Sequence, residues 1–176
     1  MTPKKTVVLG FQIFTLLTLT ILANCGGNDM RPKDVMNSLA KITEKTIFDD
    51  LSLTIYYISP SILTRAPLSV DDLMNFNSVK KIVINGNDIE EHIDFFEKIS
   101  KDDLIPVKKT SRIDARFYYV FESEKDGKIL DVAMWGDDNS IFINGFEVKG
   151  NDIFYDVIKP FLSEEAKNDL DAYLGK

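Results

Sequence analysis

The sequence predicts one α+β domain, built on an antiparallel meander sheet of four to six strands with helices packed on one face. Two dipeptides that favour tight β-turns, Asp126-Gly127 and Asn144-Gly145, each separate a pair of apolar segments, as in β-hairpins. Apolar residues at helical spacing occur before and after these hairpins. Runs of helix, then strand, then helix are typical of an α+β fold. The chain has 176 residues, which suits one such domain and a short appendage.

The first half of the domain is predicted to contain two helices and two strands. Segment 33–45 has apolar residues every three or four positions and is expected to form an amphipathic helix. Alternation over 51–57 predicts a strand. Ser69, followed three residues later by Asp72, predicts the N-cap of a short helix. The β-branched run 79–84 predicts a second strand.

Further helices are predicted after this strand and at the end of the chain. Asp88, with Glu91 three residues later, matches the pattern of a capping box, so a helix is expected to start there. Its apolar face comprises Ile89, Ile93, Phe96 and Ile99. Segment 153–161 has a helical apolar pattern that ends or kinks at Pro160, and Ser163 is expected to cap the last helix.

Four strands are predicted around the two turns. They are segments 112–123, 128–135, 140–143 and 146–149. A two-residue turn at Asp126-Gly127 places Phe121 opposite Val132 and Tyr118 opposite Trp135. Because side chains alternate between the faces of a sheet, the apolar residues of all four strands then gather on one face as the core.

The opposite face of this sheet is the candidate binding surface. It carries Arg112, Arg116, Tyr118, Trp135 and Phe142 among polar neighbours. Arg, Tyr and Trp are the residue types that dominate binding hot spots, so we expect these five to contact a protein partner. The alternative is that a helix folds over this face, in which case Tyr118 and Trp135 form an ordinary stabilising cross-strand pair.

The start of the chain resembles a bacterial lipoprotein signal. Lys4 and Lys5 precede an uncharged, mostly apolar run over 6–23, which is the pattern of an export signal. Leu22-Ala23-Asn24-Cys25 resembles the lipobox, although Asn24 stands where Gly, Ala or Ser is usual. The alternatives are an uncleaved signal anchor, since 18 residues approach the length of a membrane span, and a chance match.

This resemblance implies a domain organisation and a location. Residues 1–24 are the signal peptide, residues 25–32 are a linker, and residues 33–176 are the domain. Cys25, the only cysteine, is the lipidation site, whose acyl chains, palmitate among them, hold the protein on the membrane. The protein is exported: it lies at the outer membrane or in the periplasm of a Gram-negative cell, or on the surface of a Gram-positive cell. Gly26, in place of Asp, favours the outer membrane.

Charge and composition exclude several functions. Without residues 1–24 the chain has 19 basic and 28 acidic residues, a net charge of −9, which disfavours nucleic acid as a partner. His92 is the only histidine and is expected on the solvated side of its helix. One histidine without a second cysteine does not complete a zinc site. A nucleophile–histidine–acid triad is not supported either, because the single histidine would have to serve every role. We therefore expect no enzyme activity, no metal and no cofactor.

These properties are similar in general type to those of immunity lipoproteins, which protect bacteria from secreted toxins. The resemblance implies a non-enzymatic, lipid-anchored envelope protein that binds or neutralises a protein partner. A cationic partner suits the acidic domain. The alternative is a structural or assembly lipoprotein of the cell envelope, and a less favoured one is an enzyme or a carrier of small ligands.

Overall fold

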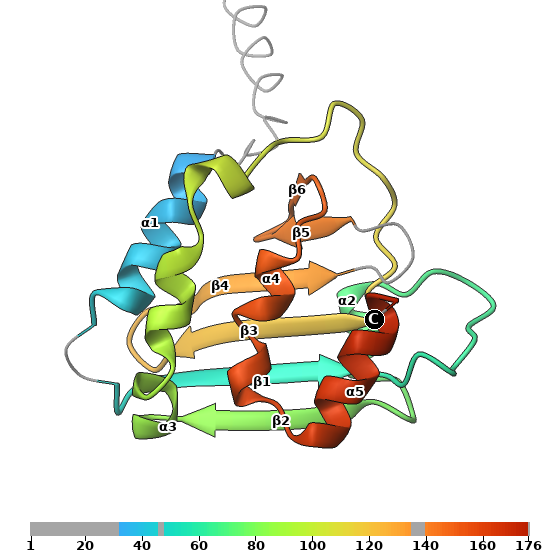
Figure 1. The fold of residues 1–176 in the computed structure, drawn as a ribbon, viewed down its shortest axis with the longest axis horizontal. Helices are drawn as coiled ribbons and strands as arrows, with labels where there is room; N and C mark the ends of the chain where they lie inside the picture. The colour runs from blue at the N-terminus through green and yellow to red at the C-terminus, as the bar shows by residue number, and fades with distance from the viewer. Residues whose placement is uncertain (1–31, 46–47, 135–139, 176) are drawn as a thin grey trace, which may run out of the picture.

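The computed structural model describes residues 32–45, 48–134 and 140–175. In these ranges the chain forms the predicted α+β domain, with one antiparallel six-stranded sheet (Figure 1). The strand order is β2-β1-β3-β4-β5-β6. The strands are β1 (Leu51–Tyr57), β2 (Lys80–Asn85), β3 (Phe117–Ser123), β4 (Gly127–Met134), β5 (Ile141–Ile143) and β6 (Phe146–Val148). β2 and β6 are therefore the two edge strands.

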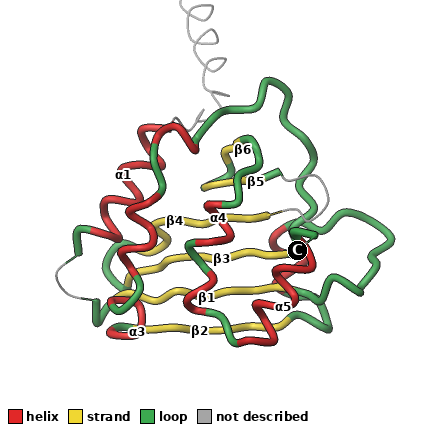
Figure 2. The backbone as a smooth tube through the Cα atoms, viewed as in Figure 1, coloured by secondary structure: helices red, strands yellow, loops and turns green. Residues whose placement is uncertain are grey.

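Most helices pack on one face of the sheet, which we call the inner face (Figures 1 and 2). They are α1 (Pro32–Thr43), α3 (Asn87–Glu90), α4 (Ile153–Asp156) and α5 (Glu164–Tyr173), with the short 3-10 helices η1 (Ile93–Lys98), η2 (Lys101–Asp103) and η3 (Lys159–Phe161). The opposite, outer face is covered in part by α2 (Val70–Met74). None of the helices in the described ranges combines the length and apolar character needed to cross a bilayer.

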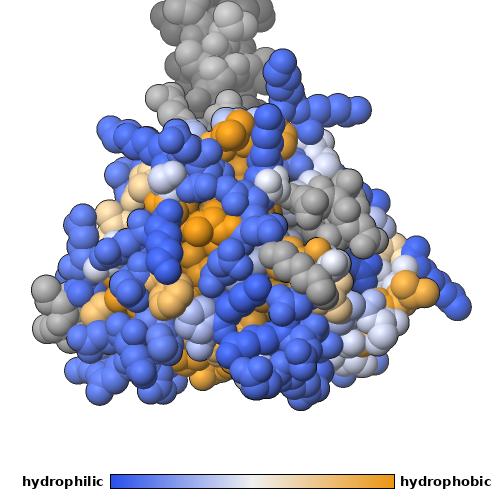
Figure 3. Space-filling model, viewed as in Figure 1, coloured by the Kyte–Doolittle hydropathy of each residue, from blue (hydrophilic) through white to orange (hydrophobic). Residues whose placement is uncertain are grey.

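The inner face holds the main core. The side chains of β3 and β4 that lie on it are those that strand alternation predicts. Phe117, Tyr119 and Phe121 of β3 lie there with Leu130, Val132 and Met134 of β4. Phe96 of η1 meets Phe121 edge to face, with ring centroids 5.0 Å apart. Edge-to-face contacts between buried rings add to the free energy of burying their apolar area. Figure 3 shows apolar side chains in a band between the helices of this face, among hydrophilic residues.

Two of the three predicted helix caps are present. The Ser69 hydroxyl accepts from the Asp72 amide, and the Asp72 carboxylate accepts from the Ser69 amide, each at 3.0 Å. Ser163 caps α5. The prediction that Asp88 caps a helix was wrong. Gly86, at a φ of +54°, turns the chain so that the helix begins at Asn87 and Asp88 lies within its first turn.

The first hairpin turns differently from the prediction. Ser123 pairs with Gly127, which leaves three residues in the turn, and Phe121 lies opposite Leu130 rather than Val132. The Ser123 hydroxyl accepts from the Lys125 and Asp126 amides of the turn at 3.2 and 3.3 Å, and a bulge follows Phe121. The pairing shifts by two positions, so each side chain keeps its predicted face. The Asn144-Gly145 turn has the two residues predicted, both at positive φ.

Candidate functional site

The outer face is not the open aromatic surface that the sequence predicts. Tyr118 and Phe142 retain only 5% and 7% of their exposure. They form a second apolar cluster with Ala133, which replaces Trp135 opposite Tyr118. Leu73 of α2 lies in the same cluster. Trp135 itself lies outside the described residues. The expectation that Tyr118 and Phe142 are available to a partner was therefore wrong.

The cover over this face is the long connection between β1 and β2, residues 58–79. Its buried and half-buried apolar side chains pack on the sheet; they are Ile58, Ile62, Leu68, Val70, Leu73, Met74, Phe76 and Val79. An apolar sheet surface is more stable when covered than when exposed to water. The connection therefore turns the outer face, at this end of the strands, into a second core.

Arg116, the second predicted hot spot, fixes this cover in place. Its guanidinium donates to the Asp114 carboxylate at 2.8 Å and to the Thr64 hydroxyl at 2.6 Å. Asp114 is buried and also accepts from the Leu68 amide at 2.8 Å. Arg116 is thus used within the domain rather than offered to a partner. Arg112 is exposed as predicted and lies near α2, where its charge is a minor cause of the lowered pKa of Asp72.

Tyr118 is buried but not isolated, because its hydroxyl reaches the polar end of the outer face. It donates to the Asp131 carboxylate at 3.2 Å, and Lys128 donates to the same carboxylate oxygen at 2.7 Å. Burial is the largest cause of the raised pKa of Tyr118, and the charge of Asp131 adds to it. The tyrosine therefore stays neutral and acts as a hydrogen-bond donor inside the fold.

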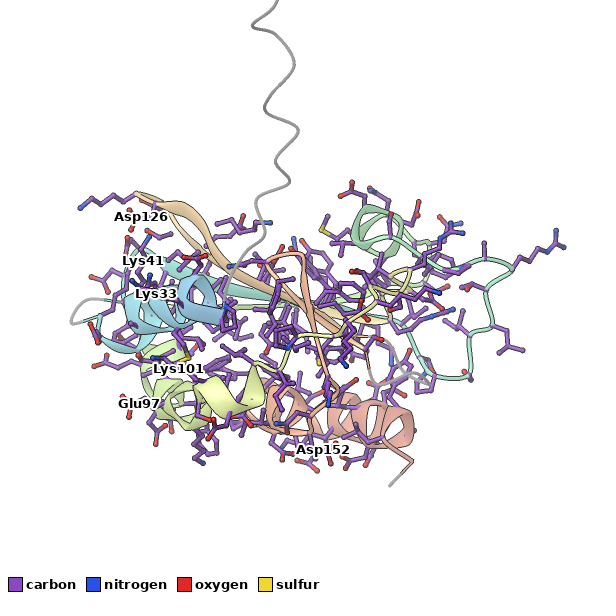
Figure 4. The ribbon with its side chains drawn as sticks, turned by 90° about the horizontal axis from the view of Figure 1, so that it is seen from above. Lys33, Lys41, Glu97, Lys101, Asp126 and Asp152 are labelled. Carbon is purple, nitrogen blue, oxygen red and sulfur yellow. The ribbon has the colours of Figure 1, made fainter. Side chains whose placement is uncertain are left out.

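The covering connection also forms a protruding loop, residues 59–67, which we call the recognition loop. It projects from the domain on the side away from Glu97 and Lys101 (Figures 1 and 4). Leu63 in this loop is 94% exposed, the largest fraction among the exposed large hydrophobic side chains of the described ranges. Arg65 is exposed beside it. Between them Thr64 is held inward, since it accepts from Arg116 and donates to the Ala66 carbonyl at 2.8 Å.

Residues 105–107 lie beside edge strand β6, on the side away from β5. The Lys149 amide donates to the Ile105 carbonyl at 2.9 Å, and the Val107 amide donates to the Glu147 carbonyl at 3.4 Å. Pro106, between them, forms a bridge to Val148. These bonds engage the Glu147 carbonyl, which points away from β5, and the Lys149 amide just past β6, so residues 105–107 lie along this edge of the sheet.

The one outer-face side chain of β6 is covered as well. Glu147 is buried, and its carboxylate accepts from the Ser111 amide and hydroxyl, each at 2.6 Å, and from the Ser140 hydroxyl at 3.1 Å. Buried carboxylates are tolerated when several donors satisfy their oxygens. Glu147 thus ties the loop before β3 to the end of the sheet.

Edge strand β2 has no such cover. The Gly86 amide donates to the Leu51 carbonyl at 3.3 Å, which fixes which residues of β2 bond to β1. By alternation, the backbone groups of Lys81, Val83 and Asn85 point away from β1, and no described residue bonds to them. Their side chains are also exposed on the outer face, and Val83 is 51% exposed.

A metal centre, the single histidine and one surface recess were the remaining features relevant to a small ligand. No group of three or more His, Cys, Asp or Glu side chains in the described ranges could hold a metal ion. His92 is half-buried rather than solvated as predicted, with its ring edge-on to Phe161 at 5.5 Å. A recess of about 340 Å³ lies between α1 and the two hairpin turns, lined by Ser38, Lys41, Asp126, Lys128, Ile129 and Asn144. Its charges are mixed, and Lys128 is already paired with Asp131.

A scan against protein-family models and searches of curated proteins and of solved structures found no match for this chain. Two surfaces of the described residues are open to contacts, the recognition loop and the edge of β2. Sequence reasoning missed both. Pro60 and Pro67 at the ends of the recognition loop are a signal of irregular, exposed chain that could have drawn attention to Leu63. No local signal marks β2 as an edge strand.

Proposed function

We propose that the chain is a non-enzymatic, lipid-anchored binding domain of the bacterial cell envelope that recognises another protein through its recognition loop. The observation that supports this most directly is the almost complete exposure of Leu63 on a loop whose neighbouring residue is fixed. A large apolar side chain left in water costs free energy, and a partner that buries it recovers about 1.5–3 kcal/mol.

The way the loop is held favours binding. Thr64 and Leu68 are each bonded to the Arg116–Asp114 pair, so the chain on both sides of Arg65 has a fixed position. A loop that is ordered before binding loses less conformational entropy when the partner arrives. Arg65 adds a cation that can reach a carboxylate or an aromatic ring of the partner beside the leucine.

The charge of the domain suits long-range attraction of a cationic partner. The net charge of −9 without residues 1–24 acts at long range, whereas the recognition loop supplies the apolar contact. Attraction by net charge changes the association rate and weakens with salt. Capture should therefore slow in high salt even when the final contact is apolar.

A photo-crosslinking amino acid placed at position 63 of the full-length protein in its native host tests the proposal. We expect one specific crosslinked protein, and we expect Leu63→Asp to abolish binding of that protein after purification, while melting temperature is unchanged. The same probe at Glu97, which is exposed on the opposite side, is the matched control (Figure 4). Equal crosslinking at both positions, or full binding by Leu63→Asp, would reject the recognition loop as the contact.

The identity of the crosslinked protein separates the two envelope functions. A secreted toxin that loses activity on binding supports an immunity role, whereas a component of a transport or assembly machine supports a structural role. A gene for either protein beside the gene for this chain points the same way.

The proposed anchor has its own test. Cells fed an alkyne-bearing palmitate should label the wild-type protein, and Cys25→Ser should remove both the label and the membrane association. An unlabelled wild type that stays in the membrane fraction would favour an uncleaved signal anchor instead. This outcome bears on the anchor alone and leaves the recognition loop to be tested separately.

A further inference from the structure

We propose that the open edge of β2 pairs with the β2 edge of a second copy of this chain, which extends the sheet across a two-fold axis. This inference concerns a surface separate from the recognition loop, so it stands or falls independently of the proposed function. Exposed edge strands present rows of unpaired amides and carbonyls, and pairing with another strand is the interaction that satisfies them.

The charges that usually protect an edge strand are engaged elsewhere in β2. Lys80 is bound to Glu165 at 2.8 Å and to Asp169 at 2.9 Å, both on α5 of the inner face. Lys81 lies over the ring of Tyr56, with its ammonium 5.2 Å from the ring centroid. Lysines discourage strand addition when their charge projects past the edge. Here the charges are drawn towards the two faces of the sheet.

The sequence of the edge is complementary to itself in one antiparallel register. If two copies meet with Val83 opposite Val83 of the second copy, the remaining outward residues pair as Lys81 with Asn85, twice by symmetry. No like charges then face one another, and the two half-exposed valines bury each other. Each outward residue has both its amide and its carbonyl available, so this register uses all of the outward backbone groups of β2.

The same register places apolar side chains together on the inner face. Ile82 lies opposite Ile84 of the second copy, and both residues are half-buried at the border of the main core. Cross-strand pairs of β-branched residues stabilise a sheet. The contact therefore gains apolar pairs on both faces as well as backbone hydrogen bonds.

A second copy is favoured over a growing assembly because the opposite edge of the sheet is closed. In the described ranges residues 105–107, including Pro106, lie along β6, so both remaining edges of a dimer joined through β2 are covered. A contact that uses the same surface on both subunits gives a closed two-fold pair. The interface is a single strand wide, so the association should depend on concentration, and confinement to a membrane surface would promote it.

Disulfide trapping of the full-length protein in detergent tests both the contact and its register. In the proposed register the Cα atoms of the two Val83 residues are about 5.5 Å apart, within disulfide range, whereas two Asn85 residues are about 13 Å apart. Val83→Cys should therefore form a covalent dimer on mild oxidation, and Asn85→Cys alone should not. Lys81→Cys mixed with Asn85→Cys should give the mixed dimer. Mass spectrometry of the linked peptides separates these bridges from any that involve Cys25, which wild type also contains.

Association without crosslinks is measured by light scattering over a dilution series. Val83→Lys places two ammonium groups opposite each other and should weaken association at least tenfold, while Val83→Thr, which keeps the β-branched shape, should retain it within threefold. Circular dichroism verifies that both variants fold. A wild type that is monomeric at all concentrations and yields no Val83→Cys crosslink would overturn the proposal. So would crosslinks through position 83 to another protein only.

Discussion

The two edge strands of the sheet differ in how far other residues of the chain cover them. At β6 the outward Glu147 carbonyl and the Lys149 amide just past the strand are bonded to residues 105–107, and the one outer-face side chain, Glu147, is buried among serine donors. At β2 the outward backbone groups have no described partner, and every outer-face side chain is exposed. Both strands contain β-branched residues, so the difference lies in what the rest of the chain places beside them.

This difference shows how the domain uses its long connections. The connection between η2 and β3 runs along β6 and closes that edge, and the connection between β1 and β2 covers the outer face at the Tyr118 end. Neither reaches the side of β2. An edge left open in a domain that covers its other edge is a position where association with another chain is possible.

The largest expected effect comes from breaking the closed edge. Glu147→Ala removes the acceptor of the Ser111 amide and of two hydroxyl groups. The half-buried Ser111 amide is left without an acceptor, and the Ser111 and Ser140 hydroxyls keep only their contact with each other at 3.2 Å. We expect a loss of about 3 kcal/mol in the free energy of unfolding, measured by denaturant titration. Glu147→Gln, which keeps one acceptor oxygen, should lose about half as much. A change below about 1 kcal/mol for Glu147→Ala would mean that β6 does not depend on this cover.

A slightly smaller effect is expected at the Arg116–Asp114 ion pair, which holds residues 58–79 on the outer face. Arg116→Ala leaves the Asp114 carboxylate buried without its cation and releases Thr64. Breaking a largely buried pair, with some exposure remaining at both side chains, should cost about 2 kcal/mol. Unfolding of Arg116→Lys is the control, since it keeps the charge but replaces the Nη2 group that donates to both partners with an ammonium group on a different stem. A stable Arg116→Ala variant would contradict the structural role and restore the idea of a free arginine.

The stability contributed by the ion pairs of Lys80 in β2 with Glu165 and Asp169 in α5 is expected to depend on pH. Lys80 lowers the pKa of Glu165, and the two carboxylates raise the pKa of Lys80. A lowered carboxyl pKa stabilises the fold above the unfolded value of about 4.3 and loses this contribution as pH falls through the folded value. A raised lysine pKa stabilises the fold below about 10.4 and loses this contribution as pH rises through the folded value.

Lys80→Met tests this pairing. The difference in melting temperature between wild type and Lys80→Met should be constant from about pH 5 to pH 10 and should shrink on either side. Thermal unfolding followed by circular dichroism at several pH values measures it. A difference that is the same at pH 3 and at pH 7 would show that the ion pair does not hold Lys80 at the edge.

The smallest effect on stability is expected at the recognition loop. Leu63→Ala removes a side chain that contacts little of the domain, so the free energy of unfolding should change by less than about 0.5 kcal/mol. The proposed partner should nevertheless bind this variant more weakly. A clear loss of stability would place Leu63 in the fold rather than at a contact.

Local patterns in the sequence predicted the elements and the faces well. Alternation assigned Tyr119 to the core and Tyr118 to the other face, and the Asn144-Gly145 turn formed as expected. The Asp126-Gly127 turn differed because the Ser123 hydroxyl captures two turn amides, a side-chain effect that the dipeptide rule does not include.

Tertiary placement could not be predicted in the same way. The apolar residues of 58–79 indicate that this connection packs somewhere, but nothing local says that it packs on Tyr118. Arg116 has the composition of a hot spot, and only the position of Asp114 and Thr64 in space shows that it is used internally. Whether a strand lies at an edge depends on strand order, which the alternation within β2 does not reveal.

Amide hydrogen exchange compares the two edges most directly. The Lys149 amide, just past β6, is bonded to the Ile105 carbonyl, whereas the Val83 amide in β2 has no described partner. Across a dilution series of the full-length protein in detergent, the Lys149 amide should stay protected, while the Val83 amide should exchange quickly in dilute samples and slowly in concentrated ones. A Val83 amide that exchanges at the same rate at every concentration would contradict strand pairing through β2.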